Sequence, residues 1–147
     1  MRRIFYVFFI AGLATVACGT SDSPTASTEV TQPVADTRTI QDDPSFQLVV
    51  QEVFDRRGCA SVACHGSALS GGLDLRTGAS YAALVNVPAV AELGLRVVAG
   101  DPDMSYLVVK LEGRQLVGSA MPQGAASLDE IDLTNIRNWI LQGAENN

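Results

Sequence analysis

The chain has 147 residues, with 16 acidic and 10 basic side chains and a formal net charge of −6 at neutral pH. This acidic balance argues against nucleic acid as a partner and against charge-driven binding to anionic lipid. The length fits one folded domain with terminal segments. The chain contains three cysteines and a single histidine, His65, so these two residue types restrict the chemistry most closely.

Residues 1–17 have the composition of an export signal. Arg2 and Arg3 precede an apolar run over residues 4–16, and small residues lead to Cys18. The run is shorter than the about 20 residues that a membrane-spanning helix needs, so we expect a cleaved signal peptide. A small residue followed by Cys18 resembles a bacterial lipobox, which predicts a lipid on Cys18. Plain secretion with an unmodified Cys18 and a retained membrane helix are the alternatives.

The lipid predicts an exported protein anchored at the bacterial cell envelope, either periplasm-facing or in the outer membrane. Residues 18–43 form its lipidated N-terminus and a disordered linker, because they are rich in Thr, Ser and Pro and lack aromatic residues. Cleavage after residue 17 leaves 8 basic residues against 16 acidic ones, a formal charge of −8. This excess predicts partner proteins that carry basic docking patches.

The folded domain is expected over residues 44–147, and it begins with a helix. Asp43 followed by Pro44 predicts an N-cap and a first helical residue. Apolar residues at positions 46, 49, 50, 53 and 54 then form one face of an amphipathic helix, and Gly58 ends it. The next helix is a short one over residues 79–86.

Two more helices are expected in the second half of the chain. Asp101 followed by Pro102 predicts a helix that runs through Leu111. Residues 127–130 have the sequence of a capping box, which starts a last helix that ends at Gly143. No segment alternates with a period of two, so the fold class is all-α with long loops. The apolar face of the last helix comprises Leu128, Ile131, Ile136, Trp139 and Ile140.

The segment after the first helix carries the most specific motif in the chain. Cys59 and Cys64 are separated by four residues, and His65 follows directly. This is a wider form of C-x-x-C-H, the motif of covalent haem attachment. We therefore expect one covalently bound haem c, with thioether bonds to both cysteines and His65 as an iron ligand. A disulfide between the two cysteines is the alternative; a zinc site lacks a fourth ligand.

The candidates for the second axial ligand are Met104 and Met121, because His65 is the only histidine and Met1 leaves with the signal peptide. Core packing is the alternative role of either methionine. Met104 is expected in the first turn of a helix, whereas Met121 lies in a loop before a proline. A loop stiffened by proline suits a segment that wraps the far face of the ring, so the sequence favours Met121 over Met104. A pair of His and Met ligands gives the iron a higher reduction potential than other ligand pairs do, and it leaves no open position at the iron for a substrate.

Three basic residues and one aromatic complete the candidate site residues. Arg96, Lys110 and Arg114 fit either pairing with haem propionates or solvated surface charge. Trp139 is predicted to be a core aromatic between the first and last helices rather than an electron relay.

Several segments of the chain occur in the same order in one group of proteins. Together they cover nearly all of residues 46–144, and the chain resembles the c-type cytochrome domains of planctomycete and myxobacterial exported proteins. The segments are Cys59 to His65 with its wide spacer, residues 71–75, residues 100–103, residues 105–107, Met121–Pro122, and the motif of Ile136, Trp139, Ile140, Gly143 and Ala144.

The resemblance implies a cytochrome c-like fold whose first and last helices cross beside the haem. It implies thioether bonds at Cys59 and Cys64, His65 as the proximal ligand and Met121 as the distal ligand. The expected function is that of a monohaem single-electron carrier, not an enzyme. The alternatives are a non-redox structural or binding lipoprotein with a Cys59–Cys64 disulfide, and a haem enzyme or gas sensor with a displaceable sixth ligand.

Overall fold

The computed structural model describes residues 37–147, which belong to one compact unit. The predicted signal peptide (1–17), the predicted lipidation site Cys18 and residues 19–36 of the predicted linker lie outside the described residues. Regular structure in the described part is helical, and β pairing there consists of isolated bridges. In chain order the elements are η1 (Phe46–Val50), α1 (Gln51–Arg56), η2 (Ser70–Gly72), α2 (Ser80–Leu84), α3 (Tyr106–Leu111) and α4 (Glu130–Leu141).

The first helical segment is the π-helical turn η1, which continues directly into α1. Its N-cap is Ser45, whose hydroxyl accepts a hydrogen bond from Leu48 N–H at 3.3 Å. The prediction of a cap at Asp43 and a helix start at Pro44 is therefore wrong by two residues. The cause is the extended backbone of Ser45, which cannot belong to the helix. The helix ends before Gly58, as predicted, and Gly58 adopts a φ of 71°.

The predicted starts of the last two helices are also too early. Asp101 and Pro102 form a turn in which the Asp101 carboxylate accepts from Met104 N–H at 3.1 Å, and α3 begins only at Tyr106. The N-cap of α4 is Asp129, whose carboxylate accepts from Asp132 N–H at 3.0 Å, so the predicted capping box over residues 127–130 is wrong. The ends of these helices and the short helix α2 match the prediction to within two residues.

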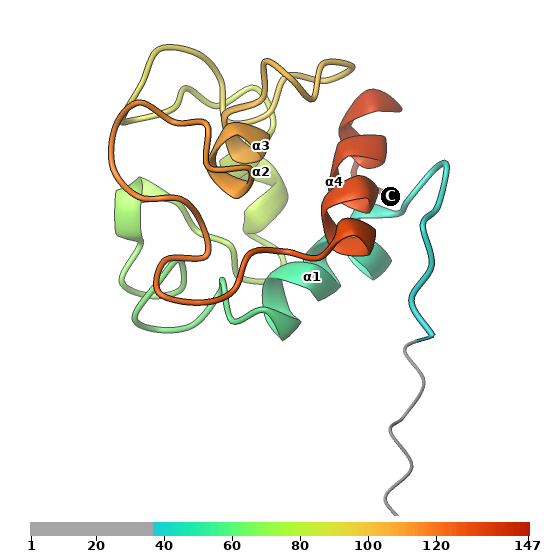
Figure 1. Cartoon of the computed structure of the whole chain (residues 1–147), viewed down its shortest axis with the longest axis horizontal. Coiled ribbons are helices and arrows are strands. Elements are labelled where there is room, and N and C mark those ends of the chain that lie inside the picture. The colour runs from blue at the N-terminus through green and yellow to red at the C-terminus, as the bar shows by residue number, and fades with distance from the viewer. Residues whose placement is uncertain (1–36) are drawn as a thin grey trace, which may run out of the picture. The chain divides into compact units, whose positions relative to one another are not determined.

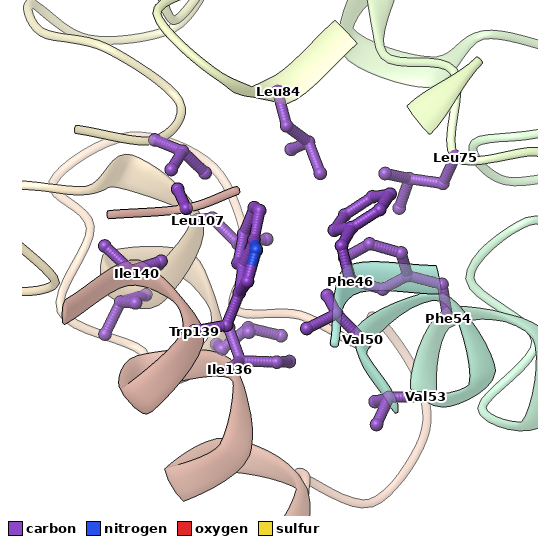
Figure 2. Packing of buried hydrophobic residues seen from close by; sticks show 14 residues of the cluster. Phe46, Val50, Val53, Phe54, Leu75, Leu84, Leu107, Ile136, Trp139 and Ile140 are labelled. Carbon is purple, nitrogen blue, oxygen red and sulfur yellow. The ribbon is translucent and has the colours of Figure 1, made fainter. Parts of the chain in front are cut away.

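The core joins the beginning and the end of the domain. Helix α4 packs against η1 and α3, and Figure 2 shows Trp139 of α4 facing Phe46 of η1. Their ring centroids lie 4.9 Å apart, and the ring of Tyr81 lies 5.2 Å from that of Phe46. Trp139 is 1% exposed and its indole N–H donates to Glu145 O at 2.8 Å. The prediction that Trp139 is a core aromatic is confirmed.

The segment just before the first helix lies against the helices. Residues 37–43 belong to the predicted linker, yet Gln41 N–H donates to the Asn135 side chain at 2.8 Å, and that side chain donates back to Thr39 O at 2.9 Å. Arg38 and Arg56 both donate to Oδ1 of Asp132, which is 1% exposed. The compact unit therefore starts before residue 44, because α4 supplies polar partners for this segment.

Long loops connect the helices and gather on one side of the unit. Figure 1 shows α1 and α4 together on one side, while residues 57–79 and 112–129 extend to the other. Within residues 37–147, no helix is both long enough and apolar enough to cross a membrane.

Candidate functional site

The predicted haem motif forms a compact loop at the end of α1. The N–H of Cys59 donates to Phe54 O at 2.8 Å, and the N–H of His65 donates to Cys59 O at 3.0 Å. These two bonds fix the loop to the helix and bring the two ends of the motif together. Residues 60–63 therefore form a closed loop, and the backbones of Cys59 and His65 lie within hydrogen-bonding distance despite the four-residue spacer.

Gly66 allows this loop to close. It is buried, and a Cβ atom at this position would lie 2.5 Å from Ala60 O and 2.6 Å from Ser61 O. Its N–H donates to Ser61 O at 2.9 Å. The residue after His65 must therefore lack a side chain for reasons of space.

The half-buried His65 has its ring orientation fixed by the backbone. Its Nδ1 lies 2.8 Å from Ser70 O. A carbonyl oxygen only accepts, so Nδ1 carries the proton and Nε2 keeps its lone pair. Burial lowers the pKa of His65, with a further decrease from the positive charges of Arg96 and Lys110 and a partial increase from the Ser70 carbonyl. The ring is thus neutral at pH 7, which is the form that binds metals.

A cavity of about 630 Å³ lies inside the loops. Cys59, Cys64, His65 and Met121, the residues predicted to hold haem, all line it. Its volume falls in the range of roughly 300–1,000 Å³ that is typical of ligand pockets. Most of the remaining wall is apolar, so the cavity fits a large, mainly apolar ligand. Buried wall residues include Phe54, Leu75, Leu84, Leu107 and Leu111.

The two candidate methionines lie in different environments. Met121 is half-buried, packs against the hydrophobic core and has its N–H bonded to Lys110 O at 2.9 Å. Met104 is 68% exposed and does not line the cavity. Of the two sulfur atoms, only that of Met121 therefore belongs to a residue of the cavity wall.

The charged residues of the cavity wall are all basic. Arg57, Arg96 and Lys110 line it, and no Asp or Glu of the described residues does. The chain as a whole has six more acidic than basic residues, so the charge of the cavity wall is opposite in sign to the net charge of the chain. The wall is electrostatically suited to a ligand that is apolar in its body and carries anionic groups.

Arg96 is the most buried of these cations, with 8% of its surface exposed. Its guanidinium donates to the backbone oxygens of Ala83 at 2.8 Å, Gly72 at 3.0 Å and Gly71 at 3.2 Å. No carboxylate in residues 37–147 lies within salt-bridge distance of it. Burial lowers the pKa of Arg96, yet an arginine stays protonated in a protein. Among residues 37–147, the buried charge therefore has no counter-ion.

Cys59 and Cys64 are both free thiols in the structure. Cys59 is half-buried and Cys64 is exposed. Burial raises the pKa of the Cys59 thiol, and the charge of Arg57 partly opposes this increase. Both side chains line the same cavity, so a ligand in it has access to two thiols and one imidazole.

Other metal chemistry finds no support in the described part of the chain. No group of three or more His, Cys, Asp or Glu side chains in residues 37–147 could hold a metal ion. The wall of the cavity offers one imidazole, from His65, and one thioether, from Met121.

Three features of this site were not predicted from the sequence. Two of them involve backbone atoms: the Ser70 carbonyl next to His65, and the carbonyl groups of Ala60 and Ser61 that lie close to Gly66. The sequence indicates neither of them, apart from the presence of a glycine at position 66. The sequence predicts either a propionate partner or a solvated charge at Arg96, although this residue stands between Leu95 and Val97 in an apolar run. That run was the available signal for its burial.

Comparison of the chain with protein-family models, with curated proteins and with solved structures finds no match. The cavity and the motif that lines it are therefore the features that indicate a function.

Proposed function

We propose that this protein is a monohaem c-type cytochrome that carries single electrons, with an all-α cytochrome c-like domain around one covalently bound haem. The observation that carries the proposal is the convergence of Cys59, Cys64, His65 and Met121 on one cavity. These residues span 63 positions of the chain, and the sequence predicts them on two separate grounds: Cys59, Cys64 and His65 form one motif, and Met121 lies in a distant loop.

Each of the four residues has a defined task in this proposal. The thiols of Cys59 and Cys64 form the thioether bonds that keep the cofactor attached. His65 offers Nε2 as the proximal ligand, because Ser70 O holds Nδ1–H at 2.8 Å. Such a hydrogen bond from the far nitrogen orients a ligating histidine and makes it a better donor. Met121, which also lines the cavity, would offer its thioether as the distal ligand.

The basic residues of the wall suit the carboxylates of a haem. Arg96 is a buried cation with no counter-ion in the part of the chain that the structure describes, and Lys110 lies at the same cavity. Charge-assisted hydrogen bonds from such groups are stronger than neutral ones. The packing of α4 against η1 supports the expected crossing of the first and last helices.

Electron transfer follows from the ligand set. When bound, haem c supplies a one-electron couple at its iron. With His65 and Met121 as ligands, both axial positions belong to the protein, so a substrate has no site at the metal. The described residues then set the potential through ligand identity and burial, and they keep water from the ring with apolar walls. We therefore propose a carrier rather than an enzyme.

The predictions for the N-terminal residues complete the proposal. A lipid on Cys18 would anchor the exported protein at the cell envelope, and the cytochrome domain would exchange electrons with redox partner proteins there. The sequence charge favours partners with basic docking patches and argues against nucleic acid.

The ligand assignment is tested by comparing Met121→Leu with the matched control Met104→Leu. Both substitutions replace a thioether by an aliphatic side chain of similar volume. Reduced Met121→Leu is expected to bind carbon monoxide rapidly and to have a lower reduction potential, because it lacks its distal ligand. Met104→Leu is expected to behave like the unsubstituted protein. Rapid carbon monoxide binding by the unsubstituted protein would favour the gas-sensor or enzyme alternative.

A further inference from the structure

The segment that carries Met121 has few backbone contacts of its own. Within the described chain, residues 115–128 form a single backbone–backbone hydrogen bond, from Met121 N–H to Lys110 O. Backbone hydrogen bonds and buried apolar contacts resist the opening of such a segment. Met121 and Leu128 pack against the core, whereas Leu116 and Val117 are exposed, so this first part of the segment depends on side chains of other elements for its position.

Three charged side chains supply the missing contacts. Arg57 donates to Ala126 O at 2.7 Å and to Ser127 O at 2.8 Å, and Lys110 donates to Ser119 O. Arg57 and Lys110 also line the cavity, so they have a second role there.

Glu92 holds the segment from outside the cavity. Its Oε1 accepts hydrogen bonds from Leu116 N–H and Val117 N–H, both at 2.8 Å, and from the Tyr106 hydroxyl at 3.4 Å. It does not line the cavity. Glu92 lies in a turn that is closed by the hydrogen bond from Ala89 N–H to Gly94 O at 2.9 Å, so its carboxylate is presented by a defined piece of backbone.

We propose that Glu92 is a positioning residue that holds the Met121 segment at the cavity, an inference that rests on the proposed function. The carboxylate binds two consecutive N–H groups four and five residues before Met121. Bonds of this kind to an ionised acceptor are stronger than neutral ones. Their loss leaves two N–H groups without these partners and frees the segment to swing away, taking the distal ligand with it.

The test compares Glu92→Ala and Glu92→Gln with the matched control Glu130→Ala. Glu130 is an exposed carboxylate in the first turn of α4, so its substitution removes the same group elsewhere. Amide hydrogen exchange at Leu116, Val117 and Met121 reports the position of the segment. The iron–thioether absorption band, the carbon monoxide binding rate and the reduction potential report the ligand.

In Glu92→Ala, exchange at these amides should rise by about tenfold or more, the effect of losing at least one bond to a charged group. The iron–thioether band should weaken, carbon monoxide should bind faster and the potential should fall. Glu92→Gln should lie between this variant and the unsubstituted protein, since its amide oxygen still accepts. Glu130→Ala should leave all four readouts unchanged.

The outcomes separate this inference from the proposed function. If the unsubstituted protein shows a methionine-ligated haem and Glu92→Ala keeps its band and carbon monoxide rate, the inference is overturned while the proposed function stands. If the unsubstituted protein carries no haem, the proposed function is wrong, whatever the Glu92 variants show. Should Glu92→Ala not fold, Glu92→Gln decides, and unchanged exchange at Leu116 and Val117 overturns the inference.

Discussion

The substitution Gly66→Ala tests the geometry of the cysteine–histidine loop most sharply. A methyl group at position 66 would lie 2.5 Å from Ala60 O, 2.6 Å from Ser61 O and 2.9 Å from Ser61 C. All three are backbone atoms, which cannot rotate away as a side chain can. The loop has to open to admit the methyl group, and the hydrogen bond from Gly66 N–H to Ser61 O at 2.9 Å lies directly in the affected region.

The magnitude follows from three contributions to the free energy of unfolding. Inserting a methyl group into packed structure costs about 1–3 kcal/mol, and weakening the Gly66 N–H bond costs about 1 kcal/mol. The lower entropy of unfolded alanine offsets roughly 0.5–1 kcal/mol. We expect a net loss of about 1–3.5 kcal/mol, or on the order of 4–14 °C in Tm for a domain of this size.

The assay is urea unfolding of Gly66→Ala beside the control Gly124→Ala. Gly124 has a φ of 74° with nothing within 4 Å of the added Cβ, so the control carries backbone strain without a clash. Its expected cost is about 1–2 kcal/mol. Haem attachment should fall in Gly66→Ala and stay normal in the control. A Gly66→Ala protein as stable as the control, with normal haem attachment, would refute the loop geometry.

Two further predictions concern single charged groups. Asp129→Ala removes the N-cap of α4. The hydrogen bond from Asp132 N–H lowers the pKa of the Asp129 carboxyl. The ionised carboxylate therefore stabilises the fold at pH values above its unfolded pKa, and this stabilisation is lost as the pH falls through the lower folded pKa. Urea unfolding should show that the free energy of unfolding of Asp129→Ala is lower than that of the unsubstituted protein by about 1 kcal/mol at pH 7, and that the difference shrinks near pH 2. An equal difference at the two pH values would contradict this role of Asp129. Arg96→Met should reduce the fraction of exported protein that carries haem and lower the free energy of unfolding by about 1–3 kcal/mol. The exposed control Arg114→Met should do neither, and equal results for the pair would contradict the role of Arg96.

Helix positions were predictable because burial requires periodic apolar residues. Phe46, Val50, Val53 and Phe54 are buried as their spacing predicts. Helix starts were less predictable, since neighbouring polar residues compete for one cap. Ser45 replaces Asp43, and Asp129 replaces Ser127, because in each case the later residue has extended backbone and a hydrogen-bonded side chain.

The candidate site was predictable where one residue type is chemically required, and unpredictable where the contact is to backbone. The motif alone identifies Cys59, Cys64 and His65. The Ser70 carbonyl that orients His65 could belong to any residue type, so no pattern indicates it. The burial of Arg96 depends on three carbonyl oxygens from two distant segments, which only the folded chain brings together.

The most direct test of covalent haem binding is the mass of the peptide that contains Cys59 to His65. The full chain is exported in a host with a cytochrome c maturation system, denatured and digested, and the peptide is weighed without reduction. We predict a mass increased by one haem that survives denaturation. A peptide without haem and lighter by two hydrogens would show a Cys59–Cys64 disulfide and contradict the proposed function.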